Sequence, residues 1–205
     1  MGSAQGPGTI WALSRPVFYY DLSSPYAYLA AARVDDVLPV SPEWRPIAFG
    51  VILQQTGKVP WSFAPDRQAD FDEIARRAAE RGLPPVRYPD GWPVTTYSIV
   101  ALRAALLMSD QLERRALSRE LFRQAFAEGR HLADLATVLQ AAVDAGIDPE
   151  AVRAGVERQA IKDGLRRETD AALRRGVTGV PTIAVGDALF WGDDRLEEAA
   201  EAVGR

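Results

Sequence analysis

The stretch Pro16–Tyr28 reads Pro-Val-Phe-Tyr-Tyr-Asp-Leu-Ser-Ser-Pro-Tyr-Ala-Tyr and changes character in its middle. Its first half, up to Asp21, is an aromatic and β-branched run that is typical of a buried strand. In its second half, Ser23 and Ser24 precede Pro25, and a serine N-cap followed by proline in the first turn predicts the start of a helix. The stretch therefore predicts a corner at which a strand passes directly into a helix.

The segments around this corner extend the pattern at both ends of the chain. A second strand is expected over residues 43–49, and a helical crossover of this length implies that the two strands are parallel. Near the C-terminus, residues 181–186 and 188–191 read as two short strands, and Gly186-Asp187 between them is a hairpin signal. A final helix is expected from about Asp193 to Val203.

The middle of the chain is almost wholly helical in pattern. The predicted helices cover residues 67–81, 95–108, 110–128, 134–145 and 149–175, with Asp148 as a cap before Pro149 and a possible break near Gly164. The sequence therefore predicts an α/β fold in which residues 15–65 and 176–205 form one domain and 66–175 are an inserted all-helical subdomain, with a ligand cleft between the two. Residues 1–14 are expected to be a flexible extension.

Composition excludes several kinds of chemistry. The chain has 205 residues with no cysteine and one histidine, which excludes a disulfide, a thiolate nucleophile of its own, a cysteine-based zinc site and a multi-histidine metal centre. We therefore expect no metal. The 24 basic and 28 acidic residues give a net charge of −4, so a nucleic acid partner is not expected. No apolar run is long enough for a membrane span, and Met1 to Ser14 does not resemble a secretory signal, so we expect a soluble, cytoplasmic protein.

Three segments carry residues that could bind a ligand. A serine at the corner would lie among the unpaired N–H groups of a helix start, where an anion such as a thiolate is favoured, although capping alone also explains it. The Val180-Pro181 bond could be cis, which would present the backbone of Val180 to a ligand, or it could be an ordinary loop-to-strand proline. Asp193 and Asp194 could cap the last helix, or also bind the charged groups of an α-amino acid.

Taken together, these motifs resemble a known family. Ser24-Pro-Tyr-Ala27 stands where a disulfide oxidoreductase carries Cys-Pro-x-Cys. It is followed along the chain by a helical insertion, then by Gly179-Val-Pro-Thr182, and then by a Phe-Trp-Gly-x-Asp-Arg motif at Phe190–Arg195. The pattern resembles the DsbA-like branch of the thioredoxin superfamily, and within it 2-hydroxychromene-2-carboxylate isomerases and kappa-class glutathione transferases. The resemblance implies a thioredoxin-like fold with an inserted helical subdomain and a bound cofactor, glutathione or another low-molecular-weight thiol.

The resemblance also implies roles for individual residues. Ser24 would be catalytic, with its hydroxyl bonded to the glutathione sulfur. The backbone at Val180 and Pro181 would pair with the cysteinyl part of glutathione, and Asp193, Asp194 and Arg195 would hold its γ-glutamyl group.

The substrate side departs from the family pattern. Thr56-Gly-Lys-Val-Pro60 lacks an asparagine that members often carry, and Val94-Thr-Thr96 replaces a common Val-Asn-Thr. We expect an aromatic small-molecule substrate to be bound by the side chains of Lys58, Trp61, Tyr88 and Trp92, with Phe63 as a further aromatic candidate and Arg67 or Arg87 as further carboxylate partners. The only histidine, His131, is expected to be solvated.

The resemblance implies a glutathione-dependent isomerase that acts by reversible addition of a thiolate to the substrate. Two alternatives stay open, a kappa-type glutathione transferase and a thioredoxin-fold binding module without chemistry of its own. A homodimer is possible in each case.

Overall fold

The computed structural model describes residues 15–203, so the extension expected over residues 1–14 lies outside the described part of the chain. The first two strands, β1 (Val17–Tyr20) and β2 (Glu43–Pro46), are parallel, which confirms the prediction. The other two, β3 (Thr182–Val185) and β4 (Ala188–Trp191), form the predicted hairpin. β3 pairs with β1 in antiparallel orientation, so the sheet has the order β2-β1-β3-β4. The sheet therefore joins strands from the N-terminal and C-terminal parts of the chain.

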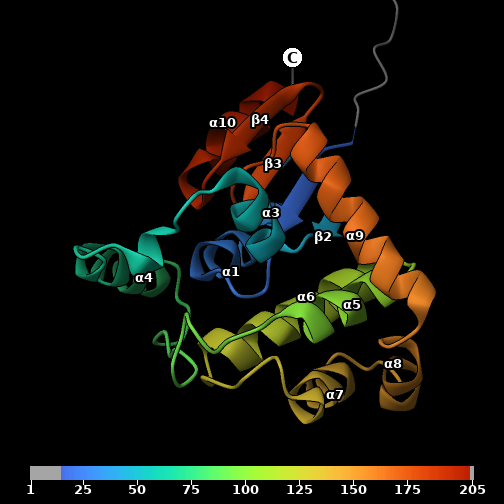
Figure 1. Ribbon diagram of the computed structural model, residues 1–205. Helices are drawn as coiled ribbons and strands as arrows, with labels where there is room; N and C mark the ends of the chain where they lie inside the picture. Colours follow the sequence, from blue (N-terminus) through green and yellow to red (C-terminus); the bar gives the residue numbers. More distant parts are fainter. Residues whose placement is uncertain (1–14, 204–205) are drawn as a thin grey trace, which may run out of the picture.

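Ten α-helices and two short 3₁₀ turns surround this sheet in the described residues. In chain order they are α1 (Pro25–Ala31), α2 (Val34–Val37), α3 (Phe49–Thr56), η1 (Trp61–Phe63), α4 (Gln68–Glu80), α5 (Ile99–Leu107), α6 (Gln111–Phe126), α7 (Leu135–Asp144), α8 (Pro149–Gly155), α9 (Gln159–Arg174), η2 (Asp193–Arg195) and α10 (Leu196–Val203). In Figure 1, α4 stands out at one side, α7 and α8 lie at the end away from the sheet, and α9 runs from α8 back to the sheet.

Alternate residues of β1 face opposite sides of the sheet, as strand geometry requires. Phe18 and Tyr20 belong to the main hydrophobic core with residues of α1, α6 and α10. Val17 and Tyr19 belong to a second core that includes Ile52 of α3 and residues at the end of α9. The strand is therefore buried on both faces, which explains its continuous apolar pattern.

Two predicted helix boundaries are wrong. The helix expected from residue 95 begins only at Ile99, because residues 90–94 form a turn in which the N–H groups of Val94 and Thr95 donate to the carbonyl oxygen of Gly91. The helix expected over 149–175 is broken at residues 156–158 and not near Gly164, which lies inside α9. A Cβ at Gly164 would come within 3.1 Å of the Leu106 side chain, so this glycine permits close packing of α9 on α5.

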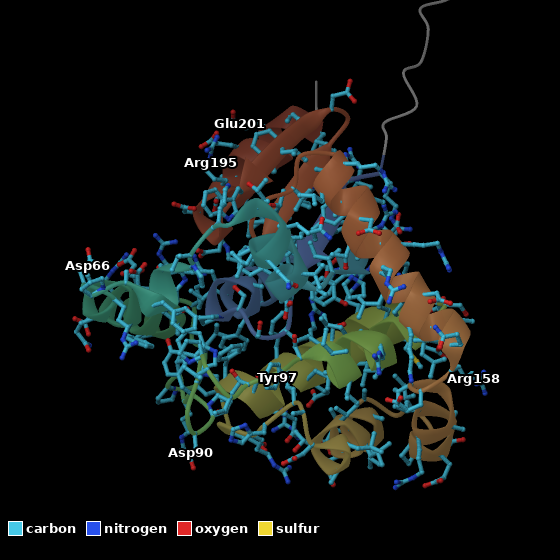
Figure 2. The ribbon with its side chains drawn as sticks, in the orientation of Figure 1. Asp66, Asp90, Tyr97, Arg158, Arg195 and Glu201 are labelled. Carbon is cyan, nitrogen blue, oxygen red and sulfur yellow. The ribbon has the colours of Figure 1, made fainter. Side chains whose placement is uncertain are left out.

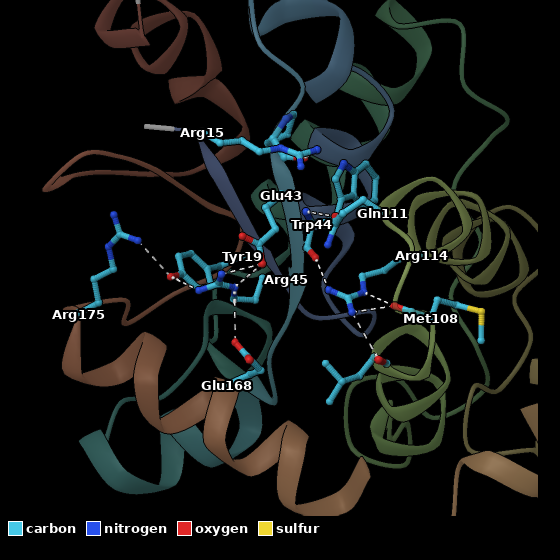
Figure 3. A network of polar contacts seen from close by, with 12 residues as sticks. Arg15, Tyr19, Glu43, Trp44, Arg45, Met108, Gln111, Arg114, Glu168 and Arg175 are labelled. Atoms are coloured by element: carbon cyan, nitrogen blue, oxygen red, sulfur yellow. Dashed lines mark hydrogen bonds and ion pairs between the residues drawn. The ribbon is translucent and has the colours of Figure 1, made fainter. Parts of the chain in front are cut away.

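A buried arginine joins the sheet to the helical part. Arg114 of α6 donates hydrogen bonds to the carbonyl oxygen of Trp44 in β2 at 3.2 Å and to that of Met108, just after α5, at 2.7 Å (Figure 3). Carbonyl groups at the end of a helix lack partners within the helix, and a cation satisfies them well. Arg114 therefore fixes β2 and the end of α5 relative to α6.

On the other side of β2, polar side chains link the sheet to α9. The Arg45 guanidinium contacts Glu43 at 2.6 Å and Glu168 of α9 at 3.4 Å (Figure 3). The hydroxyl of Tyr19 accepts longer hydrogen bonds from Arg45 and Arg175. Within residues 15–203, no helix is both long and apolar enough to cross a membrane.

Candidate active site

A cavity of about 360 Å³ lies where the corner after β1, the start of β3 and the turn after β4 meet the loop after α3. It brings together segments from both ends of the sequence and one residue of α4. The side chains and backbone that line it are Ser24, Tyr26, Phe49, Leu53, Lys58, Val59, Pro60, Trp61, Arg77, Thr178, Val180, Pro181, Trp191, Gly192, Asp193 and Asp194.

Ser24 is the N-cap of α1, and Pro25 occupies the first turn as predicted. Its hydroxyl oxygen accepts a hydrogen bond from the N–H of Ala27 at 3.2 Å. That contact uses the oxygen as an acceptor, so the hydroxyl proton can be donated to a group in the cavity. Ser23 is committed elsewhere, because its hydroxyl donates to Asp21 at 2.9 Å. Of the two serines, Ser24 is therefore the one that both caps the helix and lines the cavity.

Asp21 holds the corner in place. Its side chain is 2% exposed, and one carboxylate oxygen accepts hydrogen bonds from the N–H of Ser23 at 2.9 Å and the hydroxyl of Ser98 at 2.6 Å. The other oxygen accepts from the N–H of Phe49 at 2.8 Å. One buried carboxylate thus connects the end of β1, the start of α3 and the start of α5, and so fixes the position from which Ser24 faces the cavity.

The Val180-Pro181 bond is cis, which agrees with the first of the two alternatives considered from the sequence. Both residues are buried and line the cavity. Beside them, the indole of Trp191 lies so close to Gly179 that a Cβ there would be 2.2 Å from the indole nitrogen. Gly179 therefore makes room for the Trp191 side chain, which lines the cavity and is 62% exposed.

The two neighbouring aspartates have different environments. Asp193 is completely buried, and its two carboxylate oxygens lie 2.6 Å from guanidinium nitrogens of Arg77 and Arg81, both from the α4 region. The side chain of Asp194 is 61% exposed and lies 3.9 Å from Arg77. Since Asp193 is neutralised by two arginines, Asp194 is the carboxylate that remains open to a ligand.

Arg195 lies away from the cavity. It does not line it, and its guanidinium contacts Glu198 of α10 at 2.5 Å. Figure 2 shows Arg195 on the outer side of the molecule, near Glu201. Arg195 is thus adjacent to the cavity-lining residue Asp194 in sequence, but its guanidinium group is paired with Glu198 and not directed to the cavity.

Lys58 and Trp61 line the cavity, as expected for substrate-binding residues. The Lys58 ammonium group donates a hydrogen bond to the Thr178 hydroxyl at 3.0 Å, so it is held near the Val180 side of the cavity. Trp61 packs edge-on against Tyr26, with 5.6 Å between ring centroids.

Tyr88 and Trp92 do not line the cavity. They lie behind Trp61, and the Trp61 and Trp92 ring centroids are 5.6 Å apart. The Trp92 indole N–H donates to the carbonyl oxygen of Ser23 at 3.2 Å. These two residues support Trp61 and the serine corner from behind. The other candidates, Phe63, Arg67, Arg87 and His131, also lie outside the lining.

Tyr26 forms a wall of the cavity and is no base. Its hydroxyl donates a hydrogen bond to Asp70 at 2.8 Å. Burial, and then this hydrogen bond to a carboxylate, raise the pKa of Tyr26 well above its usual value. The phenol therefore stays protonated at neutral pH.

Sequence reasoning missed several lining residues. Arg77 gave no local signal, because its ion pair is with a residue 116 positions later in the chain. Trp191 belonged to the Phe-Trp-Gly-x-Asp-Arg motif and Thr178 directly precedes the Gly-Val-Pro-Thr motif, but nothing in their residue types distinguished a cavity wall from packing. In the part of the chain that the structure describes, no group of three or more His, Cys, Asp or Glu residues could hold a metal ion. The site thus offers a hydroxyl donor, two cations, an open carboxylate and aromatic walls.

The chain is similar over most of its length to proteins with a named activity. Two proteins named 2-hydroxychromene-2-carboxylate isomerase are each 27% identical to the chain. The one from Sphingobium xenophagum aligns over 88% of this chain and 93% of its own length, and the one from Pseudomonas putida over 92% and 93%. The solved structure of a 2-hydroxychromene-2-carboxylate isomerase superposes with a TM-score of 0.82 at 22% identity, covering 93% of this chain and 94% of the other.

The family model of the DSBA-like thioredoxin domain matches residues 17–204, which is nearly the whole chain. This match agrees with the structure, in which both ends of the chain form one sheet and a helical insertion lies between them. The chain therefore has a DsbA-like thioredoxin fold and belongs to the DSBA-like thioredoxin domain family.

Proposed function

We propose that this protein is a glutathione-dependent isomerase of aromatic substrates of the 2-hydroxychromene-2-carboxylate type. The observation that carries the proposal is the position of Ser24, which caps α1 and lines the same cavity as Val180, Pro181 and Asp194. The names of the two relatives, which align along nearly the whole chain, support the same reaction.

The residues of the cavity fit a small thiol peptide. The chain contains no cysteine, so a sulfur nucleophile has to come from a bound molecule. Asp194 has an exposed carboxylate that suits the ammonium group of a γ-glutamyl residue. When bound, glutathione would supply a thiolate for conjugate addition: as the C–S bond forms, the electron pair of the double bond moves to the conjugated carbonyl oxygen and leaves a rotatable single bond, and the return of that pair reforms the double bond and releases the thiolate.

Ser24 would act as a hydrogen-bond donor to the sulfur, which favours the thiolate over the thiol. A free thiol with a pKa of about 8.5 is only about 3% ionised at neutral pH, and lowering its pKa to about 6.5 raises the thiolate fraction roughly 25-fold. That factor corresponds to about 2 kcal/mol, which is a small part of a typical enzymatic rate enhancement. Positioning of the substrate has to supply the larger part.

Lys58 and Trp61 are the residues best suited to position the substrate. The ammonium group of Lys58 can pair with a substrate carboxylate, and the ring of Trp61 can stack on an aromatic ring. Tyr88 and Trp92 would act indirectly, by fixing the orientation of Trp61.

The test is to follow isomerisation of 2-hydroxychromene-2-carboxylate by absorbance, with and without added glutathione. We expect turnover that depends on glutathione without consuming it, and a loss of turnover in Lys58→Ala. Formation of a stable glutathione adduct would instead support the transferase. No turnover and no glutathione binding at millimolar concentration would support a binding module and contradict the proposal.

A further inference from the structure

A second cavity lies on the opposite side of α3 from the candidate active site. It has a volume of about 240 Å³ and is bounded by α3, α5 and α9. Its apolar side is formed by Val51, Ile99 and Leu165, one from each helix. We call it the α3–α9 groove. The active-site cavity is lined from the same helix by Phe49 and Leu53, so α3 separates the two cavities.

The polar side of the α3–α9 groove is cationic. Arg103, Lys162 and Arg166 line it, against one acidic residue, Asp170. Arg166 makes no ion pair with any residue of the described chain, and the Nε atom of Arg103 is buried without a hydrogen-bond partner. In a protein with a net charge of −4, this local excess of positive charge attracts anions to the groove.

A carboxylate of the protein itself already contacts two of these cations. The Glu157 side chain, which is 62% exposed, lies 3.0 Å from Arg103 and 2.7 Å from Lys162. The hydrogen bond from Lys162 is the main reason that the pKa of Glu157 is lowered. The Lys162 ammonium group is therefore placed to bind a carboxylate, and an incoming carboxylate at Lys162 would compete with Glu157.

We infer that the α3–α9 groove binds a small monocarboxylate with an apolar body, such as an aromatic acid. The carboxylate would contact Arg166 and Lys162, and the apolar body would cover Val51, Ile99 and Leu165. An apolar surface with a few placed polar groups is typical of small-molecule sites, and cationic side chains favour a carboxylate among possible ligands. This inference does not depend on the proposed isomerase activity.

The probe is 1-naphthoate, titrated against protein with labelled methyl groups and followed by NMR. We expect saturable shifts at Val51, Ile99 and Leu165. The uncharged 1-naphthalenemethanol, which keeps the ring system, should bind more weakly. Shifts confined to Leu53 and other residues of the active-site cavity would contradict the inference, as would the absence of saturation.

Two pairs of variants distinguish binding in the α3–α9 groove from a general attraction of anions to the protein surface. Each pair compares a residue at the groove with a residue of like charge outside it. Arg166→Ala should weaken naphthoate binding by about fivefold, the effect of one exposed charged contact, whereas Arg167→Ala should leave it unchanged. Arg167 is exposed on the same helix and does not line the groove. Equal weakening in both variants would overturn the inference.

The second pair tests competition with the internal carboxylate. Glu157→Gln should tighten naphthoate binding, because it frees Arg103 and Lys162, while Glu150→Gln should not. Glu150 is an exposed acid of α8 that contacts neither cation. Tightening by the same factor in both variants would mean that only the net charge matters, and would contradict the site.

Discussion

Arg77 of α4 and Asp193 of η2 form an ion pair in which a guanidinium nitrogen and a carboxylate oxygen are 2.6 Å apart, although the residues are separated by 116 positions in the sequence. Arg81 contacts the other oxygen of the same carboxylate at 2.6 Å. Arg77 also lines the candidate active site. This contact attaches the protruding helix α4 to the thioredoxin-like part of the molecule, at the edge of the cavity.

Loss of the Asp193 carboxylate should destabilise the fold. Asp193→Ala leaves Arg77 and Arg81 without their buried partner, and we expect a loss of about 2–3 kcal/mol, below the range for fully buried pairs because both arginines are partly exposed. Asp194→Ala, at the exposed neighbour, should change the free energy of unfolding by less than about 0.5 kcal/mol. Urea denaturation measures both. Equal effects would contradict the different roles of the two aspartates.

Gly179 and Trp191 should show strong coupling. Gly179→Ala places a methyl group about where the indole lies, and we expect overpacking to cost about 1–3 kcal/mol. In the Trp191→Ala background the same substitution should cost much less, because the clash is gone. A double-mutant cycle on unfolding free energies measures this. If the two substitutions changed the free energy of unfolding additively, the cost of Gly179→Ala would not come from a clash with the Trp191 indole.

The acid sensitivity of α4 should depend on Glu73. Hydrogen bonds from Arg76 and Arg77 lower the pKa of Glu73 to about 2. A carboxyl group whose pKa is depressed in the folded state stabilises the fold above its unfolded pKa and loses that contribution as the pH falls through the folded value. Glu73→Gln should therefore lower the midpoint of thermal unfolding near neutral pH, and the difference from the parent should vanish as the pH falls from about 4.5 towards 2.

The control for this experiment is Asp72→Asn. Asp72 lies on the same helix and accepts a hydrogen bond only from Gln68 among the contacts found in the described residues. Its effect on the midpoint should not follow the same pH dependence. A Glu73→Gln difference that persists at pH 2 would be inconsistent with the ion pairs described.

Glutathione affinity should depend more on Asp194 than on Ser24. Asp194→Ala removes the open carboxylate that would bind an ammonium group, and we expect roughly tenfold weaker binding. Ser24→Ala removes one hydrogen bond to sulfur and should weaken binding by less than about threefold. Isothermal titration calorimetry compares them. A larger loss in Ser24→Ala would contradict the assigned roles.

The sequence predicted those features that depend on local chemistry. The capping serine, the Gly186-Asp187 hairpin and the cap at Asp148 follow from residue types and their immediate neighbours, and the parallel first strand pair follows from the length of the helical crossover. The cis bond before Pro181 could be named only as one of two alternatives, because the cis and trans isomers of a bond before proline differ little in intrinsic free energy and the surrounding fold selects one of them.

Features that depend on distant partners could not be predicted in this way. Gly164 reads as a helix breaker, but it lies inside α9, where the absence of a Cβ permits close packing on the side chain of Leu106 from another helix. Nothing in the sequence around Arg114 marks it as buried, yet it binds carbonyl groups from β2 and the end of α5. The aromatic side chains of Tyr88 and Trp92 are of a type that can line a cavity. They do not line it because Trp61, which contacts Trp92, lies between them and the cavity.

The central claim is that the hydroxyl of Ser24 stabilises the thiolate of a bound small thiol, and the most direct measurement is the pKa of that thiol in the complex, followed by ultraviolet absorbance of the thiolate. We predict that bound glutathione titrates well below the ordinary thiol value of about 8.5, and that Ser24→Ala raises this pKa by about one unit while binding persists. An identical thiol pKa in the parent and in Ser24→Ala would contradict the account.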